Sequence, residues 1–271
     1  MGINVASVGY NLTTPSVEYL ADRYTTKAAI MVTASHLPYI QNGLKISFLS
    51  HPSPILPEEA EREKRGMAEI LHLEDEADNA YHRLLLETVD SCEGISLCVD
   101  HMHGTTAKIF PRVVEEKGGR ILGELRNIVN GFFPSIERNA PEPTDYGNLK
   151  ALSKLVIDKK AEIGVAFDGD GDRLIALNED GLIIDPAVLG LIFAGDASSK
   201  HGKGQFVAER KLLFVGEALE DMGLTPIFSA TGRAKMKKAI FDSAAYGGYE
   251  VSGHIFDGNG YDDGMRNMLR L

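Results

Sequence analysis

Basic residues are scarce in this chain of 271 residues: Lys and Arg together number 28, against 39 Asp and Glu. The formal net charge of −11 means that the chain lacks the basic footprint with which proteins bind phosphate backbones, so we expect no nucleic-acid partner. The same charge argues against binding at a membrane surface, which is itself negative. Any phosphate-binding site must therefore be local, built from a few Arg or Lys side chains, helix N-termini or a metal ion.

Cysteines and long apolar runs are also rare. The spacing of Cys92 and Cys98 fits neither a zinc pair nor a CxxC redox motif, so we expect free thiols, as in a reducing compartment. No run approaches the ~20 apolar residues of a membrane span, and the first residues lack the basic and apolar segments of a secretory signal. We predict a cytoplasmic protein and leave an organelle open, because the N-terminus of the protein can lie upstream. The sequence does not define the oligomeric state.

Short apolar runs alternate with amphipathic helical patterns along the chain, and a charged, helical and solvated arm is expected at 57–90. The runs that are typical of strands lie at 28–34, 94–100, 162–168 and 173–184. Such alternation predicts an α/β fold with mixed, mostly parallel sheets sandwiched by helices, arranged as consecutive similar α/β domains. We place the domain boundaries near residues 92 and 196, which gives three domains, 1–92, 93–196 and 197–271.

The sharpest motif, DGDGDR at 168–173, lies between two strand-like runs. Its carboxylates, Asp168, Asp170 and Asp172, alternate with glycines and can direct their oxygens to one point. Such a set suits a hard cation, above all Mg²⁺. Without a cation, three charges so close together would repel one another and shift their pKa values. We predict a Mg²⁺ site rather than a solvated acidic turn, because apolar runs lead directly into and out of the motif.

An EF-hand calcium loop is the main alternative for this motif. The three aspartates would take positions 1, 3 and 5 of the loop, and Glu179 would take position 12. Position 6 of an EF-hand is glycine, whereas here it is Arg173, and the flanking runs are β-like where an EF-hand needs helices. Two flanking helices and a preference for calcium would favour the EF-hand.

Two further polar motifs carry less information when each is taken alone. In TASHLP, at 33–38, Ser35 follows a strand-like run, His36 lies beside it, and Lys45 comes ten residues after Ser35. By itself such a serine is more simply a turn residue or a helix cap, and the histidine a structural donor.

The second polar motif is YEVSGH, at 249–254. Its residues Glu250, Ser252 and His254 alternate, so in an extended segment they would share one face. An acceptor, a hydroxyl and an imidazole on one face suit the hydroxyl groups of a sugar. The polar face of a solvated strand is an equally good explanation of this motif alone.

Together and in this order, the three motifs resemble those of the α-D-phosphohexomutase superfamily, which includes phosphoglucomutase, phosphomannomutase and phosphoglucosamine mutase. The family's serine loop reads TASHNP followed by NGxK, its metal loop DGDxDR and its sugar loop GExSGH; here they read TASHLP with NGLK, DGDGDR and YEVSGH. The segment PEPT (141–144) and the turn TGR (231–233) are similar too. The resemblance implies a partial first domain with the phosphoserine loop, a second domain with the metal loop, and a third domain, complete or not, with the sugar loop.

The resemblance also implies an activity. Members of the superfamily are isomerases of carbohydrate metabolism that interconvert hexose 1-phosphate and hexose 6-phosphate through a phosphoserine, with a hexose 1,6-bisphosphate as activator. Ser35 would carry the phosphoryl group and give Mg²⁺ a fourth oxygen ligand, and Arg173 would clamp phosphate oxygens. His36 and Lys45 would handle protons or steady charge near the serine. The implied substrate contacts are Glu250, Ser252 and His254 to sugar hydroxyls, and Arg233 to phosphate.

Some positions depart from the family pattern. Leu37 replaces the Asn of the serine loop, and Tyr249 replaces the glycine before the sugar-loop Glu. The lead-in to the serine loop is short, and no loop of the Arg-Ser-Gly-Thr type follows, as a fourth domain would supply. These departures favour an alternative, a truncated or catalytically impaired relative that binds phosphosugars or acts by interaction. In such a chain we expect Met265, Met268 and Leu269 to form an unpartnered helical face. The sequence does not identify the hexose.

Overall fold

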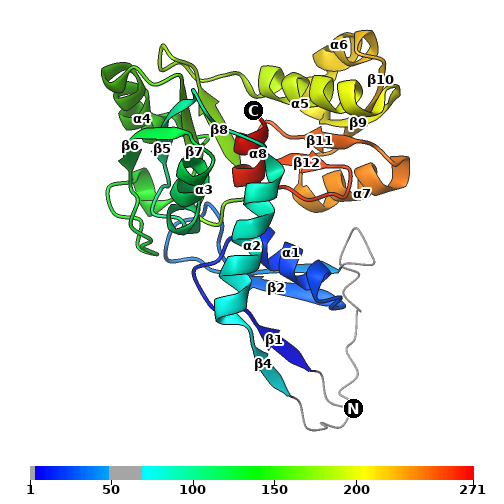
Figure 1. Ribbon diagram of the computed structural model, residues 1–271. Helices are drawn as coiled ribbons and strands as arrows, with labels where there is room; N and C mark the ends of the chain where they lie inside the picture. Colours follow the sequence, from blue (N-terminus) through cyan, green and yellow to red (C-terminus); the bar gives the residue numbers. More distant parts are fainter. Residues whose placement is uncertain (1–3, 49–68) are drawn as a thin grey trace.

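The computed structural model describes residues 4–48 and 69–271, which form three lobes (Figure 1). The described strands form two four-stranded sheets, with the orders β6-β5-β7-β8 and β10-β9-β11-β12, and two two-stranded sheets, β1-β4 and β2-β3. In each four-stranded sheet three strands run parallel and the last is antiparallel. The expected fold class, α/β with mixed and mostly parallel sheets, is confirmed. The division into three domains at residues 92 and 196 stays a prediction.

The first lobe carries the serine motif. Its elements are β1 (Val5–Ser7), α1 (Thr14–Arg23), β2 (Ala28–Val32), β3 (Leu44–Phe48), β4 (Ile70–His72) and α2 (Glu74–Thr88). Thr13 caps α1 by accepting the amide N–H of Ser16 at 3.2 Å. Strand β2 pairs antiparallel with β3, and the register of Val32 with Leu44 brings the serine loop and Lys45 to one end of this hairpin. Of the expected solvated arm at 57–90, residues up to 68 lie outside the described residues. The expectation of a solvated arm was wrong for α2, because Ala77, Ala80 and Leu85 are buried.

The middle lobe carries the acidic motif. Its elements are β5 (Ser96–Asp100), the 3₁₀ helix η1 (Thr105–Lys108), α3 (Phe110–Glu116), β6 (Arg120–Leu125), the 3₁₀ helix η2 (Glu137–Asn139), α4 (Tyr146–Lys159), β7 (Ile163–Phe167) and β8 (Leu174–Leu177). Strands β5 and β8 are buried along their whole length, as expected for strands covered on both faces. The antiparallel pair β7–β8 leaves the acidic motif as the turn between them.

The last lobe carries the sugar motif. Its elements are α5 (Pro186–His201), β9 (Gly204–Glu209), the 3₁₀ helix η3 (Arg210–Val215), α6 (Gly216–Asp221), β10 (Leu224–Ser229), α7 (Arg233–Ser243), β11 (Gly247–Tyr249), β12 (Ile255–Asp257) and α8 (Gly264–Arg270). The loops after β9, β10 and β11 follow the carboxyl ends of parallel strands, where ligands gather in α/β folds.

Helix α8 packs between the lobes. It contacts α2 and β8, and Figure 1 shows it between the middle and last lobes, at the upper end of α2. Met265, Met268 and Leu269 are buried in a core cluster that also contains Leu85 and Phe167. The expectation that these three residues form an unpartnered face was wrong, because α8 packs against α2, an earlier helix of the chain. Among the described residues, no helix combines the length and the apolar character that a membrane crossing requires.

Candidate active site

The acidic motif is a buried turn between two strands. Asp168, Asp170 and Asp172 expose at most 2% of their surface. Gly171 has φ of +74°, a conformation that favours glycine, and its amide donates to Oδ1 of Asp168 at 3.0 Å. Strands β7 and β8 flank the motif where an EF-hand would have helices, so the EF-hand alternative is excluded.

Lys45 lies against two of the three carboxylates. Its Nζ donates to Oδ2 of Asp170 at 2.8 Å and to Oδ2 of Asp172 at 2.5 Å. Burial opposes the charge of Asp172, but the Lys45 ammonium and neighbouring cationic groups outweigh burial and bring the pKa of Asp172 to about 2. For Asp168, burial and the two neighbouring carboxylates raise the pKa well above its usual value. The triad therefore holds more negative charge than Lys45 alone offsets.

The unused oxygens of the triad fit a divalent cation. One carboxylate oxygen from each aspartate lies within 4.8 Å of the others. Oδ1 of Asp170 and Oδ1 of Asp172 are buried and have no hydrogen-bond partner within the described part of the chain. A buried unpaired carboxylate oxygen is unfavourable, and a hard cation with oxygen ligands would satisfy both. The residues present therefore fit Mg²⁺.

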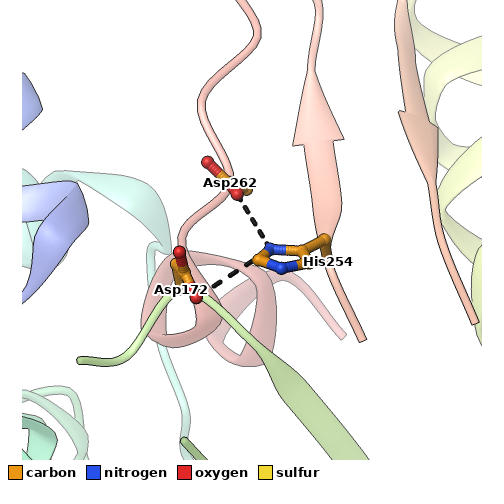
Figure 2. A group of neighbouring side chains, drawn as sticks. All are labelled: Asp172, His254 and Asp262. Atoms are coloured by element: carbon orange, nitrogen blue, oxygen red, sulfur yellow. Dashed lines mark ion pairs between the residues drawn. The ribbon is translucent and has the colours of Figure 1, made fainter. Parts of the chain in front are cut away.

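A second group, Asp172, His254 and Asp262, also has a metal-like arrangement (Figure 2). Its charges are already paired: Nδ1 of His254 lies 2.9 Å from Oδ2 of Asp262, and Arg233 donates to both oxygens of Asp262 at 2.6 Å. Although burial opposes the charge of Asp262, Arg233 and Lys237 hold its pKa well below the usual range. Because these cations already neutralise Asp262, we take the triad of aspartates as the candidate metal site.

Ser35, in the first lobe, lies next to the candidate metal site. Its backbone has φ of +54°, and its amide donates to Oγ1 of Thr33 at 2.8 Å. Its hydroxyl donates to Oδ2 of Asp168 at 2.8 Å. The serine oxygen and the triad, which are 133 positions apart in the sequence, therefore share one site.

Arg173 has three close side-chain partners and also lies near Asp168, whose Oδ2 is 3.6 Å from Nε. Its Nε donates to Nε2 of His254 at 3.2 Å, its Nη1 lies 3.2 Å from Oε2 of Glu142, and its Nη2 lies 2.6 Å from Nδ1 of His36. The same ring atom of His36 is 3.3 Å from Oγ of Ser35. Burial and the Arg173 charge lower the pKa of His36, so the neutral imidazole is favoured at this position.

The sugar motif forms a turn rather than an extended segment. Strand β11 ends at Tyr249; the amide of Glu250 then donates to the carbonyl of His254 at 2.9 Å, and that of Gly253 to the carbonyl of Glu250 at 3.1 Å. The argument from alternation along a strand was therefore wrong for Glu250, Ser252 and His254. The turn nevertheless brings all three to one cavity.

That cavity, of about 560 Å³, lies where the three lobes meet. It is lined by the eight predicted site residues outside the acidic triad: Ser35, His36, Lys45, Arg173, Arg233, Glu250, Ser252 and His254. Three carboxylates that the sequence did not single out complete the network. Glu142 contacts Arg173, Asp262 contacts Arg233, and Glu18 of α1 accepts two bonds of 2.8 Å from Arg233. Only Glu142 had a signal in the sequence, as part of PEPT.

Two family models match this chain. Domain I of the phosphoglucomutase/phosphomannomutase family matches residues 1–70, and domain II, described as an alpha/beta/alpha domain like the first, matches residues 79–181. The chain belongs to the phosphohexomutase family. The match to domain I starts at residue 1 of this chain.

Named relatives agree with this family. The chain is 29% identical over 282 residues to a phosphomannomutase/phosphoglucomutase of Pseudomonas aeruginosa and 30% identical over 293 residues to a phosphoglucosamine mutase of Ligilactobacillus salivarius. All of this chain is matched, but only 59% and 63% of those proteins, so the chain spans about three fifths of their length.

Solved structures agree with the fold. A phosphoglucomutase/phosphomannomutase family protein of Burkholderia thailandensis has a TM-score of 0.84 at 25% identity, over 98% of this chain and 61% of that one. A structure described as a phosphomannomutase from Thermus thermophilus has a TM-score of 0.80 at 21% identity, over 99% of this chain and 64% of that one, and at this identity supports the fold alone.

Proposed function

We propose that this chain carries the phosphoryl-transfer site of a phosphohexomutase, which interconverts hexose 1-phosphate and hexose 6-phosphate through a phosphoserine at Ser35. The observation that carries the proposal is the hydrogen bond of 2.8 Å between Oγ of Ser35 and Oδ2 of Asp168. It joins the hydroxyl of Ser35, which can accept a phosphoryl group, to a carboxylate set that fits Mg²⁺.

The transfer exchanges one phosphorus–oxygen bond for another. Oγ of Ser35 bonds to the phosphorus of a hexose 1,6-bisphosphate, the bond from phosphorus to the sugar oxygen breaks, and the serine proton leaves for that oxygen. Mg²⁺, held by Asp168, Asp170 and Asp172, would offset charge on the transferring group. The guanidinium group of Arg173 contacts His36, and the same ring atom of His36 lies 3.3 Å from Oγ of Ser35. From this position the planar guanidinium group would bind phosphate oxygens.

The sugar would lie between the serine loop and the sugar loop. Ser252 lines the cavity, and no hydrogen bond of its hydroxyl is seen within the described residues. Glu250 already accepts the amide N–H of Gly232 at 2.6 Å through Oε1, which leaves Oε2 for a sugar hydroxyl. Among relatives, N-acetylglucosamine-phosphate mutase has been solved in its substrate and product complexes, which supports a phosphosugar as the ligand class here.

A phosphosugar-binding relative without turnover is the second candidate. The observation in its favour is that the three cations lining the cavity, Lys45, Arg173 and Arg233, already have carboxylate partners. A distal phosphate would have to compete with those partners. The exposed Leu37 also leaves the serine loop with one polar group fewer than the family motif.

Intact-mass spectrometry after incubation with glucose 1,6-bisphosphate and Mg²⁺ tests the proposal. We expect one added phosphoryl group on the wild type and none on Ser35→Ala, with peptide mapping to Ser35. Ser243→Ala is the matched control, because it removes a hydroxyl that bonds to Ala239 within α7 and does not line the cavity, and it should still be labelled. Equal labelling of wild type and Ser35→Ala, or no label on either, would leave the phosphosugar-binding candidate.

A further inference from the structure

Glu209 is a buried carboxylate that belongs to none of the sequence motifs. It is the last residue of β9, and its exposed fraction is 0%. Burying a carboxylate is unfavourable unless hydrogen bonds and charges replace the lost water. Its partners therefore indicate what the side chain does.

Two of those partners belong to loops that line the cavity. The hydroxyl of Thr231, in the loop after β10, donates to Oε1 of Glu209, and the amide N–H of Val251, in the turn after β11, donates to Oε2 at 3.0 Å. The third partner is the ammonium of Lys211, 3.0 Å from Oε1, on a largely exposed side chain. Burial opposes the charge of Glu209, but these bonds outweigh burial and lower its pKa.

These two loops carry the predicted sugar and phosphate contacts. The first holds Thr231 and Arg233, and the second holds Glu250 and Ser252, all of which line the cavity. A second bond joins the same loops, because the amide of Gly232 donates to Oε1 of Glu250 at 2.6 Å. Glu209 lies beneath both loops and does not line the cavity itself.

We propose that Glu209 is the positioning residue of the sugar-facing loops: one buried carboxylate fixes the Thr231–Arg233 turn and the Glu250–Ser252 turn relative to each other. The inference rests on the proposed function for the identity of the ligand, a hexose phosphate. It does not rest on that function for the structural effect. Loss of Glu209 loosens two loops at once and weakens binding of the sugar, while Ser35 and the metal carboxylates stay in place.

The chemistry of the two contacts selects the variants. Glu209→Gln keeps an oxygen for the amide of Val251 and can donate its NH₂ group to the hydroxyl of Thr231, which can act as acceptor. Glu209→Ala leaves the amide of Val251 without its acceptor. Thr231→Val removes one contact only. Lys211→Ala removes the exposed partner and is the matched control.

Hydrogen exchange of the full chain, read by mass spectrometry, tests the structural part. In Glu209→Ala we expect exchange to quicken at least ~10-fold in both peptides, 229–234 and 248–253, because a lost buried hydrogen bond lowers local protection. Thr231→Val should quicken exchange in peptide 229–234 alone. Glu209→Gln and Lys211→Ala should leave exchange in both peptides unchanged. If Glu209→Ala does not fold, Thr231→Val and Glu209→Gln still decide. Unchanged exchange in Thr231→Val, or quickening spread over the whole chain in Glu209→Gln, overturns the proposal.

Calorimetric titration with glucose 6-phosphate tests the functional part. We expect at least ~10-fold weaker binding by Glu209→Ala and binding within ~3-fold of wild type by Glu209→Gln and Lys211→Ala, since tenfold corresponds to one broken contact. Labelling of Ser35 by the bisphosphate at saturation should reach the same extent in all variants. If the wild type binds no sugar or accepts no phosphoryl group, the proposed function fails, and the exchange data alone then decide the role of Glu209.

Discussion

Nη2 of Arg173 lies 2.6 Å from Nδ1 of His36, the ring atom that is also 3.3 Å from Oγ of Ser35. The lone pair that His36 would use as a base toward Ser35 therefore faces an arginine. For His36 to accept the serine proton, Arg173 must turn toward another acceptor, and a phosphate in the cavity would be one. We therefore expect phosphate binding to be coupled, through the guanidinium group of Arg173, to the ability of His36 to accept the serine proton.

Replacing Arg173 by Lys should slow phosphorylation of Ser35 about 100-fold, because an ammonium keeps the charge but cannot hold His36, Glu142 and His254 together. The measurement is a time course of intact mass with glucose 1,6-bisphosphate and Mg²⁺. Arg126→Lys is the control, since Arg126 pairs with the buried Asp100 away from the cavity. A rate for Arg173→Lys within threefold of wild type would show that the planar fork is not needed.

Replacing Asp170 by Asn should weaken binding of Mg²⁺ by about tenfold or more, because one anionic ligand of a hard cation becomes neutral. Calorimetry on the purified variant measures this directly. Asp100→Asn serves as the comparison, because Asp100 is equally buried but bonds to Arg126. Equal Mg²⁺ affinity in wild type and Asp170→Asn would remove the triad as the metal site.

Lys45→Met should destabilise the fold by about 3 kcal/mol, because the buried carboxylates of Asp170 and Asp172 lose their partner. Added Mg²⁺ should restore more stability to this variant than to the wild type, since it has more uncompensated charge to offset. Thermal scans with and without Mg²⁺ measure both effects. In Lys237→Met, whose lysine contacts Glu18 and Asp262 instead, Mg²⁺ should give only the wild-type increment. The same increment in Lys45→Met would argue against a shared site.

Asp263 should make stability fall as pH rises. It is buried, it accepts a bond of 2.7 Å from the hydroxyl of Tyr81, and burial raises its pKa to about 6. In the unfolded chain an aspartate titrates near 3.9, so between pH ~4 and ~6 the folded state binds more protons. The protonated form is therefore the one that folding favours, and ionisation costs about 3 kcal/mol by pH 7.

Asp263→Asn removes this titration and keeps an oxygen for Tyr81. Denaturant unfolding of both proteins at pH 4 and at pH 7 should show the variant gaining about 3 kcal/mol on the wild type between the two. Comparing the difference cancels the other titrating groups. Two stability curves that run parallel from pH 4 to pH 7 would mean that Asp263 is not perturbed.

Candidate site residues could be predicted from the sequence where they belong to one short motif. The acidic turn could be recognised because Asp168, Asp170 and Asp172 lie within five positions and glycines permit the turn. The start of α3 at Phe110, with Pro111 in its first turn, is likewise a local property of the chain.

What the sequence did not reveal depends on tertiary contacts. Glu18 is one charged residue of an amphipathic helix until Arg233 and Lys237 pack against it, and Asp262 is one of two aspartates in a loop until Arg233 reaches it. The turn at Glu250 was mistaken for a strand because Gly253, with φ of +90°, reverses the chain at a point that alternation cannot reveal. Such pairs follow from the packing of lobes, which no window of sequence contains.

The bond between Glu18 and Arg233 joins residues that are 215 positions apart. During synthesis, the first lobe leaves the ribosome long before Arg233 has been made, so Glu18 stays without this partner until α7 has emerged. Helix α8 contacts α2 and can complete its packing only after residues 264–270 have also emerged. The cavity, whose lining runs from Thr33 to His254, is therefore incomplete until both ends of this range have been made and have folded together.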